Sequence, residues 1–139
     1  MDAELELINS VNRCQIAALQ KAGKELDPRA YDTCAIFSRH VRNVEAAVTH
    51  TYQLTAFAAI RLEDPAKAAA LWKGMTQFCE MALNALRDLK VTYAHCGTHE
   101  LYDMALDYRM EAEKRYLQNL QDSECAKIPA PEGLFPRMS

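Results

Sequence analysis

Helix-breaking residues in the first 123 positions are confined almost entirely to three places. These are Gly23 with Asp27-Pro28, then Asp64-Pro65, then Gly97-Thr98, and only Gly74 stands elsewhere. Asp before Pro is typical of a helix start, because Asp caps free backbone amides and Pro lacks an N–H that would have no partner there. Gly after a helical run ends the helix by adopting the left-handed conformation. The chain therefore predicts long helices joined by short loops.

This division predicts four helices, at about residues 2–22, 28–62, 65–95 and 98–123. Short loops make successive helices antiparallel, so the predicted fold class is all-α, a four-helix up-and-down antiparallel bundle. The bundle domain is predicted to cover residues 1–124. Residues 125–139 contain three prolines and a glycine, and we expect them to form an extended, non-helical tail.

Composition excludes several classes of protein. The 139-residue chain is half apolar, which suits one domain with a substantial core, and its net charge is −3. No basic run is longer than two residues, which argues against a nucleic-acid partner. No apolar stretch approaches the ~18 residues that a membrane helix needs. The five cysteines are scattered and the N-terminus is acidic, so we expect a cytoplasmic protein with reduced thiols.

Helical periodicity predicts which residues form the core. The region 65–95 has the clearest amphipathic pattern. Its apolar face is predicted to comprise Ala68, Leu71, Trp72, Met75, Phe78, Cys79, Ala82, Leu86, Leu89 and Tyr93. The region 28–62 is apolar over a wider sector, as expected for a helix that contacts two neighbours.

Five polar residues fall on or at the edge of apolar faces: Asn12, His40, Glu45, Arg109 and Glu113. Counted from one end of the bundle, three of them lie at a similar depth of roughly 16 Å, and the two glutamates lie one turn deeper. One interpretation is a buried polar network that specifies how the helices pack. The other is a small interior site, in which arginine binds an anionic ligand or carboxylate and imidazole bind a metal.

A second cluster of polar residues lies in the predicted turn between the last two helices. The segment His95-Cys96-Gly97-Thr98-His99-Glu100 offers three ligands for zinc or copper, namely His95, Cys96 and His99. The alternative is a tight turn in which Thr98 caps the last helix. Cys96 could also be a reactive thiol of lowered pKa, because it precedes a helix and is flanked by histidines. No cofactor is strongly implied, and a zinc-like metal is the alternative to none.

A di-iron centre is not expected, because the chain contains no Glu-x-x-His motif. Exposed apolar positions point instead to a protein partner. Ile36, Phe57 and Val91 fall at the edge or on the polar side of their helices, and the predicted helices 28–62 and 65–95 overhang the two shorter ones. We therefore expect a homodimer through these overhanging ends. The leading hypothesis is a non-enzymatic structural or interaction module that self-associates, and the alternative is a bundle that binds a small ligand or metal.

Overall fold

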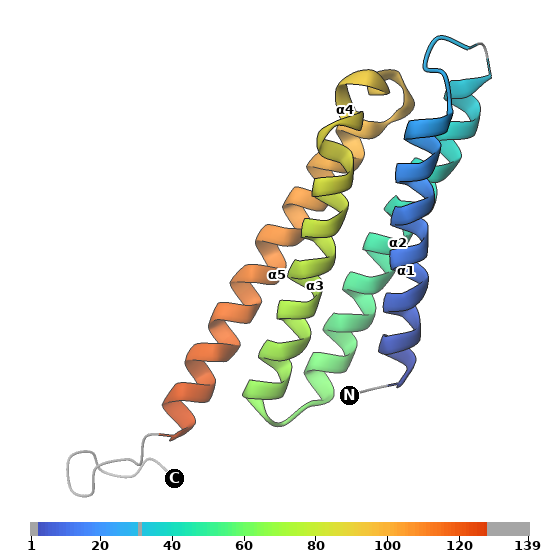
Figure 1. Ribbon diagram of the computed structural model, residues 1–139. Helices are drawn as coiled ribbons and strands as arrows, with labels where there is room; N and C mark the ends of the chain where they lie inside the picture. The colour runs from blue at the N-terminus through green and yellow to red at the C-terminus, as the bar shows by residue number, and fades with distance from the viewer. Residues whose placement is uncertain (1–2, 31, 128–139) are drawn as a thin grey trace, which may run out of the picture.

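The computed structural model describes residues 3–30 and 32–127 of the chain. Its elements are α1 (Ala3–Glu25), α2 (Thr33–Arg61), α3 (Pro65–Arg87), the short α4 (Leu89–Thr92), the 3₁₀ turn η1 (Ala94–Cys96) and α5 (Thr98–Lys127). The four long helices alternate in direction along the chain (Figure 1), and the described part contains no strand. The predicted all-α, four-helix up-and-down bundle is therefore confirmed.

The bundle is flattened, with α2 and α3 between the other two long helices. Helix α1 packs mainly on α2 and to a lesser extent on α3, whereas α5 packs closely along α3 and also contacts α2. Figure 1 shows α1 and α5 on opposite sides of the molecule. Within the described residues these two helices do not pack along one another, which keeps most residues of α1 apart from those of α5.

The start of α3 follows the predicted mechanism. Asp64 has extended backbone angles, and its carboxylate accepts a hydrogen bond of 2.9 Å from the Ala66 amide. Pro65 occupies the first helical position. The carboxylate thus satisfies an amide that the helix itself leaves without a partner.

The start of α2 differs from the prediction, because Asp27-Pro28 forms a turn and not a helix N-terminus. The Asp27 carboxylate accepts from the Arg29 amide at 3.0 Å, and its carbonyl accepts from the Ala30 amide at 3.0 Å. The Thr33 hydroxyl donates to the same Asp27 carbonyl at 2.5 Å. These bonds close the loop on itself, and the helix begins only at Thr33.

Gly23 does not end α1, which continues to Glu25. A Cβ atom at position 23 would collide with the side chain of Leu89, so glycine permits a close approach of α1 to α4. Gly97 behaves as predicted: it has a φ of 87° in the left-handed region and separates η1 from α5. The same residue type therefore has two different roles here.

The predicted helix 65–95 ends early, at Arg87, and is followed by α4 and η1. The reason is the burial of Tyr93, whose ring stacks on Phe37 with centroids 4.0 Å apart and planes 14° apart. The Tyr93 hydroxyl also donates to the carbonyls of Gly23 (3.2 Å) and Leu26 (2.9 Å), at the end of α1. Placing this ring between α1 and α2 requires the chain to leave the path of α3.

Helix lengths agree with only part of the predicted overhang. Helix α5 has 30 residues and α2 has 29, whereas α1 and α3 have 23 each. Helix α2 is longer than α1 as predicted, but α5 is not a shorter helix and α3 is not a longer one, and a homodimer through this end stays a prediction. Helix α5 continues to Lys127, beyond the predicted domain end at 124, and the rest of the predicted tail lies outside the described residues.

Most of the predicted apolar face of α3 is buried. Buried side chains include Trp72, Met75, Phe78, Cys79 and Leu86, which pack with Phe37, Val44 and Val48 of α2 and with Leu101 and Ala105 of α5. The residues predicted to be exposed, Ile36, Phe57 and Val91, are exposed. None of the helices in the described ranges has an apolar stretch long enough to cross a membrane.

Replacing Tyr93 with phenylalanine tests the anchoring role of its hydroxyl. Tyr93→Phe keeps the stack on Phe37 but leaves two carbonyls at the end of α1 without their donor. We expect a loss of about 1 kcal/mol in the free energy of unfolding, measured by urea denaturation. Tyr93→Leu, which also removes the aromatic stack, should lose at least about 1 kcal/mol more. Unchanged stability of Tyr93→Phe would show that the hydroxyl does not anchor the turn.

Candidate functional sites

Of the five polar residues proposed as an interior site, Arg109 and Glu113 lie together, and Asn12 bonds to a residue outside the set. Asn12 is buried, and its side-chain amide donates to the Thr51 hydroxyl at 2.6 Å. His40 is half-buried and Glu45 is exposed. Asn12 therefore links α1 to α2 through Thr51, and not through His40 or Glu45.

Arg109 has a partner that the helical wheel did not predict. Its Nε and Nη2 atoms donate to the Glu80 carboxylate at 3.2 and 3.1 Å, and Nη1 lies 3.6 Å from the Glu113 carboxylate. The three side chains are between 31 and 47% exposed, so the network lies at the rim of the α3–α5 contact and not in the bundle interior. Ion pairs with this much solvent contribute little to stability, and this network mainly orients α3 relative to α5.

A similar depth along the bundle does not by itself bring residues together. Depth along a helix places residues at one level, whereas the rotation of each helix decides which neighbour they face. Arg109 faces Glu80 of α3, and Asn12 faces Thr51 of α2. Because α1 and α5 lie on opposite sides of α2 and α3, residues of equal depth on these two helices stay apart.

Three potential metal ligands do meet at one end of the bundle. The ligand atoms of Cys34, His95 and Cys96 all lie within 4.8 Å of one another. Cys34 is in the first turn of α2, and the other two residues belong to η1. Within the described residues, this is the group of thiol, imidazole or carboxylate side chains that could hold a metal ion. Two of the three residues proposed from the sequence belong to it, and Cys34 takes the place of His99.

Hydrogen bonds hold this cluster in place. The Cys34 thiol donates to the carbonyl oxygen of His95 at 3.6 Å, and the Ser38 hydroxyl donates to the carbonyl oxygen of Cys96 at 3.4 Å. Ser38 also lies one turn after Cys34, with 3.8 Å between its hydroxyl oxygen and the sulfur. The start of α2 is thereby tied to the turn that precedes α5.

The cysteine of this turn is not an activated thiol. Burial, followed by its contact with Cys34, raises the pKa of the Cys96 thiol to about 11. The expectation of a lowered pKa is therefore wrong, because the buried side chain is desolvated and the helix that follows begins only after Gly97. At neutral pH this thiol is protonated unless a cation takes the place of its proton.

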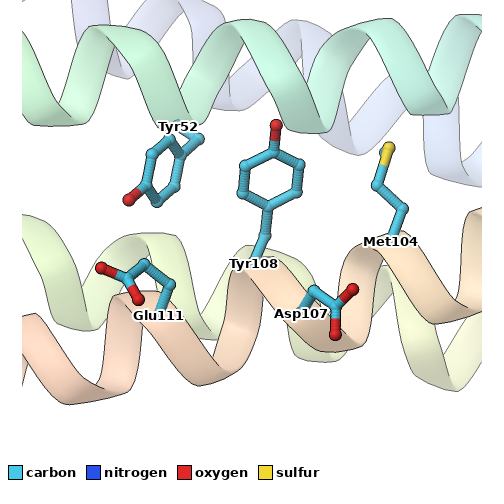
Figure 2. Close-up of a pocket in the computed structure, with 5 residues that line it drawn as sticks. All are labelled: Tyr52, Met104, Asp107, Tyr108 and Glu111. Carbon is cyan, nitrogen blue, oxygen red and sulfur yellow. The ribbon is translucent and has the colours of Figure 1, made fainter.

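An open groove lies between α2 and α5. It has a volume of about 370 Å³ and is lined by Tyr52, Met104, Asp107, Tyr108 and Glu111. Figure 2 shows the Tyr108 ring standing between the two helices, beside Tyr52, with the Asp107 carboxylate directed away from the rings. The Tyr52 ring contacts both Tyr108, at 4.8 Å between centroids, and Trp72, at 5.4 Å. Because these rings already pack against one another, the residues that line the groove serve mainly to pack α5 against α2.

One flank of α5, next to its contact with α3, carries an apolar stripe. Leu106, Met110, Leu117 and Leu120 are 37, 60, 54 and 39% exposed, and Glu113 occupies the position between the second and third. The spacing of four, three, four and three residues is the a/d heptad pattern of a coiled-coil seam. We call these five residues the α5 seam.

Comparisons with models of protein families, with curated proteins and with solved structures found no match for this chain. The geometry of these sites therefore has to indicate what the protein does.

Thiol labelling should distinguish the buried cysteines from the exposed ones. Burial raises the pKa of Cys79 to about 12, which leaves a thiolate fraction of about 10⁻⁴ at pH 8. Cys14 and Cys125 are exposed. We expect iodoacetamide to modify these two in the native protein and to modify Cys79 only after denaturation, as measured by peptide mass spectrometry. Labelling of Cys79 at the rate of Cys14 would show that the core around α3 opens readily.

Proposed function

We propose that this protein is a non-enzymatic helical interaction module that self-associates through the α5 seam. The observation that supports this proposal is the exposure of a heptad pattern on α5, beside the face with which this helix packs on α3. Soluble monomers rarely leave a long contiguous apolar stripe in water, and such stripes often mark protein contacts. A heptad pattern on a helix suits another helix as partner.

The charges beside the seam favour a second copy of this chain. Asp107 and Lys114 are both exposed and lie seven residues apart, hence on the same flank of the seam. In an antiparallel pair related by a two-fold axis, equivalent flanks of the two helices face each other. A register that places Leu106 of one copy against Leu117 of its partner copy also brings each Asp107 near a Lys114. The seam is thus complementary to itself, as a symmetric dimer requires.

Glu113 gives this arrangement specificity. A single polar residue in an otherwise apolar seam lowers the stability of the pair but selects one register and orientation. Glu113 is oriented by Arg109, at 3.6 Å, so its charge is partly compensated before any association. The α3–α5 network would then serve to position the seam.

Sedimentation velocity at micromolar concentrations tests self-association. We expect a dimer for the wild-type chain and a dissociation constant about 100-fold higher for Met110→Glu, because each copy loses about 1.5 kcal/mol of apolar burial. Phe57→Glu is the matched control, since Phe57 is 63% exposed but lies on α2 and outside the seam. A wild-type monomer at all concentrations would refute the proposal. Dissociation by Phe57→Glu alone would place the interface at the α2–α3 end.

Charge reversal tests the antiparallel register. Asp107→Lys should raise the dissociation constant about tenfold, because two symmetry-related ion pairs of about 0.7 kcal/mol each are lost. Adding Lys114→Asp to this variant should restore the wild-type value, and the effect should weaken in high salt. If the double variant had the same dissociation constant as Asp107→Lys, this pairing would be excluded. The seam itself would then still be tested by Met110→Glu.

A further inference from the structure

We propose that Cys34, His95 and Cys96 form a binding site for a thiophilic divalent metal ion of the zinc type. The ligands come from two segments that are far apart in sequence: Cys34 from the first turn of α2, and the adjacent His95 and Cys96 from η1. None of them belongs to the α5 seam, so this inference does not depend on self-association.

The distances suit a tetrahedral ion after a small adjustment. Bonds of about 2.3 Å to sulfur and about 2.0–2.1 Å to nitrogen place the ligand atoms of such a site about 3.5–3.8 Å apart. Here the three ligand atoms lie within 4.8 Å of one another. His95 is exposed and Cys34 is half-buried, so both side chains have room to rotate inward. Buried Cys96 then provides the fixed side of the site.

The chemistry of the ligands selects the metal. Two sulfurs and one imidazole nitrogen suit zinc and its borderline or soft neighbours, whereas magnesium and calcium require several oxygen ligands. The cluster contains no carboxylate among the described residues. When the ion binds, each thiol loses its proton to solvent and each sulfur donates an electron pair to the metal, without any change in oxidation state.

The site is organised before a metal arrives. The bond from the Ser38 hydroxyl to the Cys96 carbonyl fixes the turn. The Cys34 thiol already lies beside this turn, where it donates to the His95 carbonyl until metal binding removes its proton. Tyr93, two residues before His95, is anchored in the core by its stack on Phe37. Binding therefore does not have to fold the site, in contrast to metal sites in which the ion must order the chain.

Three protein ligands leave one position of a tetrahedral ion open. His95 lies on the solvent side, so a water molecule or a small ligand from solution can occupy the fourth position. Zinc sites with a free position are those that exchange ligands, whereas sites with four protein ligands are structural. The described residues thus offer an exchangeable site and not a closed one.

Cobalt titration of the full chain tests this site. The protein is reduced with a phosphine, treated with chelator and titrated with Co²⁺, whose bonds to thiolates absorb in the near ultraviolet. We expect this absorption to saturate at one ion per chain and to disappear when Zn²⁺ is added. Cys34→Ser, His95→Gln and Cys96→Ser should each weaken binding at least about 100-fold, because each removes a direct ligand.

Two matched variants separate this site from the one suggested by sequence spacing. His99→Gln removes the nearby histidine outside the cluster, and Cys125→Ser removes an exposed thiol at the other end of α5. Both should bind Co²⁺ like the wild type. Ser38→Ala should weaken binding about tenfold by releasing the Cys96 carbonyl, a positioning effect.

The possible unfolding of Cys96→Ser does not compromise the test. Cys34 and His95 are at least partly exposed, so Cys34→Ser and His95→Gln should keep the wild-type circular dichroism while losing the cobalt absorption. Absence of thiolate–cobalt absorption in the wild type would overturn the proposal. So would wild-type binding by folded Cys34→Ser, or an equal loss of binding in Cys125→Ser.

Discussion

The burial of Tyr93 is the constraint on which this end of the molecule depends. Its ring stacks on Phe37 of α2, and its hydroxyl donates to two carbonyls at the end of α1. One side chain thus joins α1, α2 and the turn before α5. The Thr98 hydroxyl in turn donates to the Tyr93 carbonyl at 2.9 Å, which connects the first residue of α5 to the same anchor.

The position of the thiol pair follows from this stack. Cys34 lies three residues before Phe37 on α2, and Cys96 lies three residues after Tyr93. Cys34 shares a face of α2 with Phe37, and the Cys96 amide donates to the Tyr93 carbonyl at 2.9 Å, so the contact between the two rings brings the two cysteines close together. The proximity of the two sulfurs is therefore a consequence of core packing, and a metal would use an arrangement that the core already maintains.

The features predicted correctly from the sequence depend on local interactions. Asp64-Pro65 starts α3 and Gly97 adopts the left-handed conformation, because capping and backbone sterics act within a few residues. Gly23 was misinterpreted, because its role is a close approach to Leu89, which lies far along the chain. Tertiary packing decides such positions, and a single sequence does not contain the distance between the two helices.

The candidate site was found only in part for a related reason. His95 and Cys96 were recognised from their neighbours, whereas Cys34 required knowledge of where α2 begins. A helix starting at residue 28 would place Cys34 in its second turn. The observed start at Thr33 places Cys34 in the first turn of α2, beside η1. Of the five proposed interior residues, Arg109 and Glu113 pair with each other, whereas Asn12 bonds to Thr51 instead. Depth along the bundle contains neither the rotation of each helix nor the separation of α1 from α5.

The metal site and the α5 seam should behave as independent features, although one helix connects them. Helix α5 begins at Thr98, immediately after the turn, and the seam begins at Leu106, about 12 Å further along the axis. Between them the orientation of α5 is determined by its packing on α3, where Arg109 bonds to Glu80. Sites more than about 7–10 Å apart with no shared partners contribute additively. Metal binding could therefore affect self-association only by shifting α5 along α3. The small buried side chains of Ala105 and Ala112 allow close packing of these two helices, which opposes such a shift.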